Sequence, residues 1–98
     1  MITIIAKSIV KDGKKEEFKR VAEELIIESR KEKGCISYNL YESQKNKNVV
    51  VFIEEWKDEV AIQLHNNSEH FKKIIPELGN LREGSSDIEH FKKIENIG

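Results

Sequence analysis

The chain has 98 residues, 38% of them hydrophobic and 36% charged, and its formal net charge at pH 7 is -1. This length leaves room for one domain with one hydrophobic core, and the composition is that of a globular rather than a disordered protein. We therefore predict a single domain over residues 1–98. Because basic and acidic residues are interleaved and nearly cancel, no long-range field favours nucleic acid or an anionic membrane as a partner.

Cys35 is the only cysteine, so the sequence excludes an internal disulfide framework. The apolar start of the chain is too short for a cleavable signal peptide, and no apolar run reaches the roughly 18 residues that a membrane span requires. The sequence thus predicts a cytoplasmic protein.

The first half of the chain predicts a strand, a helix and a hairpin. Residues 2–10 are rich in β-branched side chains, and residues 14–33 carry apolar side chains at intervals of three and four, as in an amphipathic helix. Gly34 is expected to end this helix as the residue after its C-cap. Residues 35–43 and 49–56 form two further strands, joined by a polar turn at 44–48.

The second half predicts a kinked helical segment and a last strand. Asp58 can cap a helix over 59–66, and Ser68 can cap another that Pro76 is expected to stop. A turn at 84–86 precedes a weaker strand over 87–94. The order β-α-β-β-α-β indicates an α+β, ferredoxin-like fold with an antiparallel sheet and both helical segments on one face.

The other face of this sheet also appears apolar in the sequence. The strands over 2–10 and 49–56 carry hydrophobic residues on both sides, whereas a sheet with one solvated face alternates more cleanly. We therefore expect a second copy of the chain to cover that face, giving a homodimer.

Two histidines and two glutamates are candidates for chemistry. Counted at 100° per residue, His65 falls inside the apolar arc of its helix, and His70 falls at the border of the next arc. Glu54 shares one side of its strand with Trp56, whereas Glu55 takes the other side. A carboxylate among apolar groups loses hydration, so its pKa rises and it can act as an acid or base near neutral pH.

The two histidines do not show the spacing of a metal site. They are five residues apart, which is about 140° around a continuous helix, whereas metal-binding pairs on helices are usually four apart. The sequence therefore predicts no metal.

Several spaced motifs together resemble the antibiotic biosynthesis monooxygenase family. They are the segment Gly34-Cys35-Ile36-Ser37-Tyr38, the segment Glu54-Glu55-Trp56-Lys57-Asp58, His65, and the pair His70-Phe71. The resemblance implies a dimeric α+β barrel with a pocket between each sheet and its helices. Members of that family include oxygenases that add O₂ to phenolic or quinol substrates without metal, flavin or haem.

The resemblance also implies roles for particular side chains. His65 would be the base or proton shuttle, tuned by Glu54, with Tyr38 as a hydrogen-bond donor and Trp56 as a pocket wall. Contacts to the substrate would come from His70, Phe71 and Phe52. The expected reaction is a monooxygenation of a small aromatic or quinol-type compound, with O₂ as co-substrate and no cofactor.

This sequence departs from the pattern of a haem-degrading branch that has a similar fold. That branch uses an Asn on the first strand, a Trp on the second helix and a His ten residues later. This chain has Ala6 and Lys7, His65 and Ile75 at those places. Haem degradation is therefore not expected.

Simpler interpretations of the same residues stay open. His65 could be a core histidine, Trp56 a packing residue, Glu54 a partner of a lysine or a cap for the following helix, and Tyr38 a cross-strand partner. The whole protein could be a non-catalytic binder of small molecules, or an isomerase or lyase acting on a small sugar-derived signal.

Overall fold

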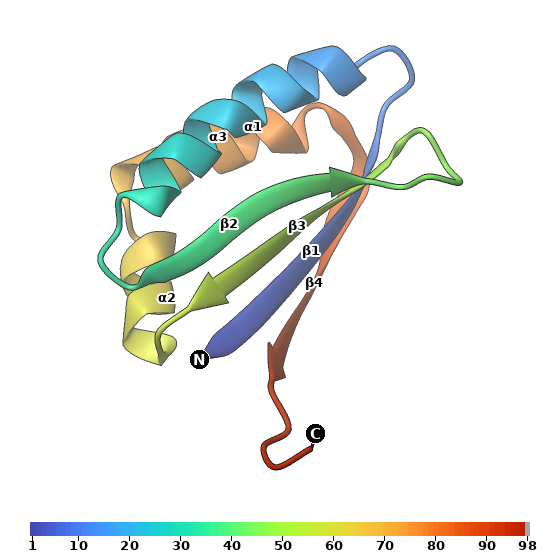
Figure 1. Ribbon diagram of the computed structural model, residues 1–98. Coiled ribbons are helices and arrows are strands. Elements are labelled where there is room, and N and C mark those ends of the chain that lie inside the picture. The colour runs from blue at the N-terminus through green and yellow to red at the C-terminus, as the bar shows by residue number, and fades with distance from the viewer. Residues whose placement is uncertain (98) are drawn as a thin grey trace.

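The computed structural model describes residues 1–97. Its elements in chain order are β1 (Ile2–Val10), α1 (Lys15–Arg30), β2 (Cys35–Glu42), β3 (Val49–Trp56), α2 (Glu59–Asn66), α3 (Glu69–Gly79) and β4 (Arg82–Lys92). The strands form one antiparallel sheet in the order β2-β3-β1-β4, and α1 and α3 lie side by side over one face (Figure 1). This confirms the ferredoxin-like α+β fold.

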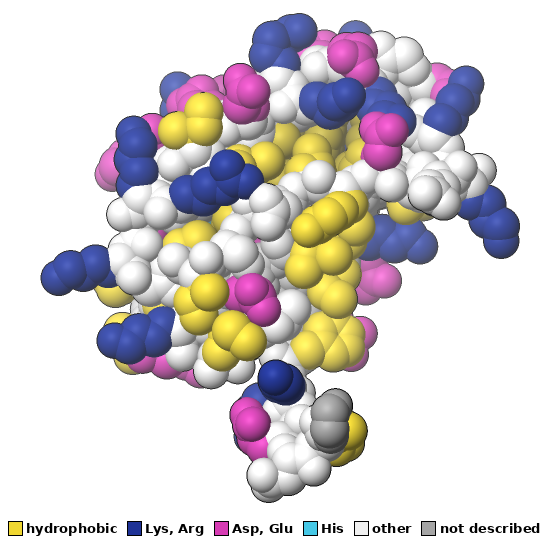
Figure 2. Space-filling model, viewed as in Figure 1, with side chains coloured by type: hydrophobic (Ala, Val, Ile, Leu, Met, Phe, Trp, Pro, Cys, Tyr) yellow, Lys and Arg dark blue, Asp and Glu magenta, His cyan; other side chains and the backbone are white. Residues whose placement is uncertain are grey.

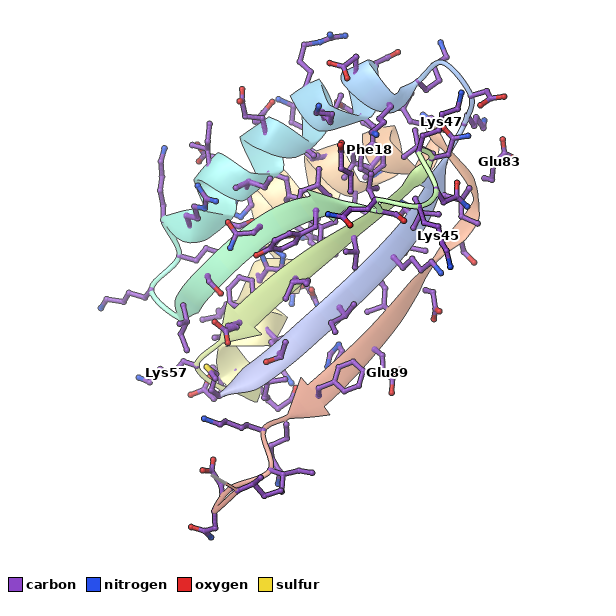
Figure 3. The ribbon with its side chains drawn as sticks, turned by 45° about the vertical axis from the view of Figure 1, so that its right-hand side comes forward. Phe18, Lys45, Lys47, Lys57, Glu83 and Glu89 are labelled. Atoms are coloured by element: carbon purple, nitrogen blue, oxygen red, sulfur yellow. The ribbon has the colours of Figure 1, made fainter. Side chains whose placement is uncertain are left out.

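The core lies between the sheet and the helices. Along β3 every second residue is buried, and these residues are Val50, Phe52, Glu54 and Trp56. They face the helices, and Phe18 of α1 is fully buried there with its ring centroid 6.4 Å from that of Phe52. Figure 3 shows Phe18 between its helix and the sheet. Strand parity therefore places Glu54, and not Glu55, on the inner face, as predicted.

Helix α1 ends earlier than its periodicity predicts. It stops at Arg30, with Lys31 as its C-cap, and Gly34 does not have the positive φ of a residue that terminates a helix. Gly34 instead lies against α2, where a Cβ on Gly34 would overlap the Cβ of Ala61. The glycine is therefore required by close packing of the connection, and the prediction that it ends the helix was wrong.

Pro76 does not stop α3. The helix continues to Gly79, and the backbone N–H of Asn80 still donates to the carbonyl of Pro76 at 3.2 Å. Proline removes one backbone donor, but the helix gains from burying Leu78 beyond it, which is 1% exposed. The expected end at Pro76 was wrong because tertiary packing outweighs the local cost.

β4 begins five residues before the predicted strand. The segment Gly84-Ser85-Ser86, expected as a turn, is a bulge inside β4. Lys7 pairs with Asp87 and Ile9 with Glu83, so three residues of β4 stand opposite one of β1. Gly84 has a φ of 59°, which glycine adopts without strain. The polar composition thus marked an irregularity within the strand.

The outer face of the sheet is partly apolar. Ile9, Tyr41 and Phe91 are 48%, 50% and 41% exposed there, beside the half-buried Val51 and Ile53. Figure 2 shows groups of hydrophobic side chains over the strands, separated by charged ones. Glu83 and Glu89 lie on β4, while Lys45 and Lys47 lie at the β2–β3 turn (Figure 3). Within residues 1–97, no helix has the length and apolar character needed to cross a membrane.

Candidate functional site

A cavity of about 190 Å³ lies between the sheet and the helices. Its walls come from β1, β2, β3, α2, α3 and β4, and most of the lining side chains are apolar. Three lining residues are exposed, Asn66 at the end of α2 and Ile88 and His90 on β4. The cavity therefore opens between the end of α2 and β4.

His65 lines one end of this cavity. Its side chain is 1% exposed, and its ring centroid lies 4.4 Å from that of Trp56, 5.0 Å from that of Phe71 and 5.5 Å from that of Tyr38. The prediction from helical phase that His65 points toward the sheet is confirmed. We call the three rings around it the His65 cage.

Glu32 holds His65 from the opposite side. Its Oε2 atom lies 2.6 Å from Nδ1 of His65 and 2.7 Å from Nε2 of His70. Glu32 belongs to the connection after α1, which Gly34 brings against α2. The sequence analysis did not identify Glu32, because it lies beyond the periodic part of the helix between two lysines, where it resembles any solvated charge.

This contact fixes how His65 can act. A carboxylate oxygen only accepts hydrogen bonds, so the proton of a neutral His65 ring is on Nδ1 and is donated to Glu32. The lone pair is then on Nε2, which is buried and has no hydrogen-bond partner among the described residues. Burial lowers the pKa of His65, although the hydrogen bond and the charge of Glu32 act in the opposite direction. In its neutral form His65, which lines the cavity, therefore has a buried basic nitrogen without a partner among the described residues.

Glu54 is the second ionisable group at this end. Burial raises its pKa to about 7, although hydrogen bonds from Trp56 and Tyr38 lower it. The indole Nε1–H of Trp56 donates to Oε1 of Glu54 at 2.9 Å. Burial and the neighbouring Glu54 in turn raise the pKa of the Tyr38 hydroxyl, which stays protonated as a donor. Burial thus raises the pKa of Glu54, as expected from the sequence.

The structure brings most of the predicted site residues together. Tyr38, Phe52, Glu54, His65 and Phe71 line the cavity. Trp56 and His70 are not among its lining residues: Trp56 packs behind His65 and holds Glu54, and His70 contacts Glu32. The carboxylate that contacts His65 is that of Glu32, whereas the sequence suggested Glu54. Arg82 and Ser86, which also line the cavity, were missed because β4 was predicted to start too late, and His90 was missed although it lies inside the predicted strand.

The two histidines are closer than a continuous helix would allow. The chain breaks at Asn67 and Ser68 between α2 and α3, and the two rings lie 5.9 Å apart. With Glu32 they form a group whose ligand atoms lie within 4.8 Å of one another, so these residues could hold a metal ion. The two hydrogen bonds to Oε2 of Glu32 account for the arrangement without one, and we assign no metal to it.

Comparison with known proteins places the chain among relatives. The model of a family described as antibiotic biosynthesis monooxygenase matches residues 1–77. The chain belongs to this family. The resemblance inferred from the spaced motifs is thereby confirmed.

Individual relatives agree with the family match. The Bacillus subtilis protein named "Putative monooxygenase YcnE" is 36% identical over 88 residues, covering 90% of this chain and 93% of that protein. The crystal structure of a conserved protein from Methanosarcina mazei has a TM-score of 0.93 at 38% identity, covering 95% of this chain and 92% of that one. A structure described as an antibiotic biosynthesis monooxygenase has a TM-score of 0.90 at 28% identity, over 96% of this chain and 99% of that one.

Proposed function

We propose that the protein is a cofactor-independent monooxygenase that acts on a small aromatic or quinol-type substrate with O₂. The observation that carries this proposal is that His65 lines a largely apolar cavity while its buried Nε2 has no hydrogen-bond partner among the described residues. Membership of a monooxygenase family supports the reaction class. A volume of about 190 Å³ suits a single substituted ring, since a cavity of roughly 150 Å³ can hold benzene.

The chemistry begins with proton transfer. Nε2 of His65 takes a proton from a substrate hydroxyl, and the carboxylate of Glu32 stabilises the imidazolium that forms. The resulting electron-rich anion gives an electron to O₂ directly. The Tyr38 hydroxyl, which donates to Glu54 in the free protein, turns to donate its hydrogen bond to an oxygen of the bound substrate. The apolar walls, including Phe52 and Phe71, keep water away from the reacting atoms.

The assembly and setting of the protein are part of the proposal. A second copy covers the outer face of the sheet around Val51 and Ile53, giving a homodimer with one cavity in each subunit. Residues 1–98 act as one domain in the cytoplasm. The partner is a small molecule, and no nucleic acid or membrane takes part.

The test is oxygen consumption with a panel of hydroquinones, corrected for the rate of oxidation without protein. We expect uptake with at least one substrate and a fall of about 10²- to 10⁴-fold in His65→Gln, because that is the usual contribution of a general base. Circular dichroism checks that the variant is folded. Full activity of His65→Gln would contradict the mechanism.

The same panel separates the other possibilities. Binding of a hydroquinone without any uptake would favour a non-catalytic binding protein. A stoichiometric shift of the haem Soret band on titration would overturn the exclusion of haem, which rests on the absence of the expected Asn, Trp and His. Ile75, at the position of the haem ligand in that branch, lines the cavity with an apolar side chain.

A further inference from the structure

The cavity has a cationic side chain at the end remote from His65. Arg82 opens β4 and lines the cavity together with Ser8 and Ser86. Arg82 pairs with Val10 of β1, whereas Glu54 pairs with Ile4, so six residues of β1 separate the two ends. Along α3, Phe71 beside His65 and Gly79 beside Arg82 are eight residues apart, about 12 Å at the rise of a helix, a span that one ring with a polar group at each end bridges with its hydrogen bonds. The two polar ends of the cavity are thus distinct.

The guanidinium of Arg82 has no acidic partner among the described residues. No carboxylate of residues 1–97 lies within ion-pair distance of it, and its Nε is buried without a hydrogen-bond partner. A buried donor without a partner has lost its hydration without compensation, and this loss is larger when the group is charged. Arg82 therefore carries an unused capacity for a hydrogen-bonded anion.

The surrounding backbone explains how this arginine is held in place. Gly79, the last residue of α3, lies close to the guanidinium, since a Cβ on Gly79 would stand 3.6 Å from Nη2 of Arg82. The C-terminal end of a helix carries partial negative charge, which favours a cation there without using the hydrogen-bond donors of the guanidinium. Two serine hydroxyls and a fixed cation at one end of an apolar cavity are the features of an anion-binding subsite.

We propose that Arg82, with Ser8 and Ser86, binds a carboxylate of the substrate, so that the ligand is an aromatic acid whose hydroxyl end points to His65. The planar guanidinium matches a carboxylate in a two-point contact, and one ring with a small group fits a cavity of about 190 Å³. Glu54 at the other end disfavours the carboxylate of the ligand there, which sets the orientation of the ligand. This inference rests on the proposed function in one respect only, which is that the proposed reaction places a hydroxyl at the other end of the ligand.

The test measures binding and needs no turnover. Isothermal titration calorimetry compares 4-hydroxybenzoate with its neutral analogue 4-hydroxybenzamide on the wild-type protein, on Arg82→Gln and on Arg20→Gln. Arg20 is exposed on α1, so this control removes the same charge far from the cavity. We expect the acid to bind about tenfold to a hundredfold more tightly than the amide, and this preference to vanish in Arg82→Gln and to persist in Arg20→Gln.

Each other outcome contradicts the proposal or redirects it. Equal binding of acid and amide to the wild type, or a preference that survives in Arg82→Gln, would overturn the subsite. Tighter binding of phenyl phosphate than of 4-hydroxybenzoate would overturn the assignment to a carboxylate in favour of a phosphate ester. An acid preference without oxygen uptake on any hydroquinone would leave the subsite standing and contradict the monooxygenase, so the two failures are distinguishable.

Discussion

At the scale of single residues, the site depends on the pairing of His65 with Glu32. The carboxylate selects the tautomer that leaves Nε2 of His65 unprotonated, and it raises the pKa that burial lowers. In this respect Glu32 positions His65, the proposed base, and influences its basicity without lining the cavity. The contact of Glu32 with His70 fixes the carboxylate in turn.

The first prediction concerns Glu32→Gln. Loss of the charge removes an influence that raises the pKa of His65, so this pKa should fall further below its ordinary value. The measurement is an NMR titration of the histidine ring protons. Glu28→Gln is the matched control, since it removes an exposed carboxylate one turn earlier that pairs with Lys31. An unchanged His65 titration in Glu32→Gln would show that the pairing does not set its basicity.

The second prediction concerns Glu54→Gln and the dependence of stability on pH. The pKa of Glu54 is about 7 in the folded protein and about 4.3 in an unfolded chain, so between these values the folded state binds more protons. Stability contributed by this group is therefore full below about pH 4 and is lost as pH rises through 7. The glutamine keeps an oxygen that can accept from Trp56 but does not ionise.

The free energy of unfolding of Glu54→Gln should thus rise relative to the wild type across this window, by on the order of 3 kcal/mol. Urea titrations at several pH values measure the difference. The lowered pKa of His65 makes the free energy of unfolding fall as pH drops below about 6.5. This contribution is the same in both proteins, so it cancels in the difference between them. A constant difference from pH 4 to pH 8 would contradict the raised pKa of Glu54.

At the scale of elements, much of the fold could be predicted because the determining patterns are local. The β-rich composition of Val49–Trp56 and the side-chain cap at Asp58 predicted β3 and α2 with their observed bounds. The failures occur where distant contacts decide. Burial of Leu78 favours the continuation of α3 beyond Pro76. A glycine is needed at position 34 because of close packing against Ala61, and not because α1 ends there. The position of Glu32 depends on the latter contact, which no local pattern reveals.

The third prediction tests this packing with Gly34→Ala. The added methyl overlaps Ala61, so we expect a loss of about 1–3 kcal/mol in the free energy of unfolding. The double variant Gly34→Ala with Ala61→Gly relieves the overlap and should recover part of the loss. Chemical denaturation of the two single variants and the double variant gives the coupling. Simple additivity would mean that the two residues are not in tight contact.

At the scale of the whole molecule, the open question is what covers the outer face of the sheet. Val51 and Ile53 lie on that face with Tyr41 and Phe91, while Glu83 and Glu89 lie along the edge strand β4. Charges on an edge strand discourage pairing through the edge, so association through the face is the favoured mode.

The fourth prediction is that the protein in solution has about twice the chain mass of 11.4 kDa. Val51→Glu should shift it toward the monomer, because the new charge would be buried between two sheets. Val60→Glu is the control, since Val60 is 62% exposed on α2, away from the sheet face. Multi-angle light scattering at micromolar concentration measures the masses. A wild-type mass near that of one chain would contradict the predicted dimer.

The position of the cavity mouth has a consequence for how a ligand enters and leaves. The exposed lining residues Asn66, Ile88 and His90 lie on the helix side of the sheet, whereas a second copy would cover the other side. A ligand can therefore exchange without separation of the two subunits. Its association and dissociation rate constants should be independent of protein concentration, even across the range in which the proposed dimer forms.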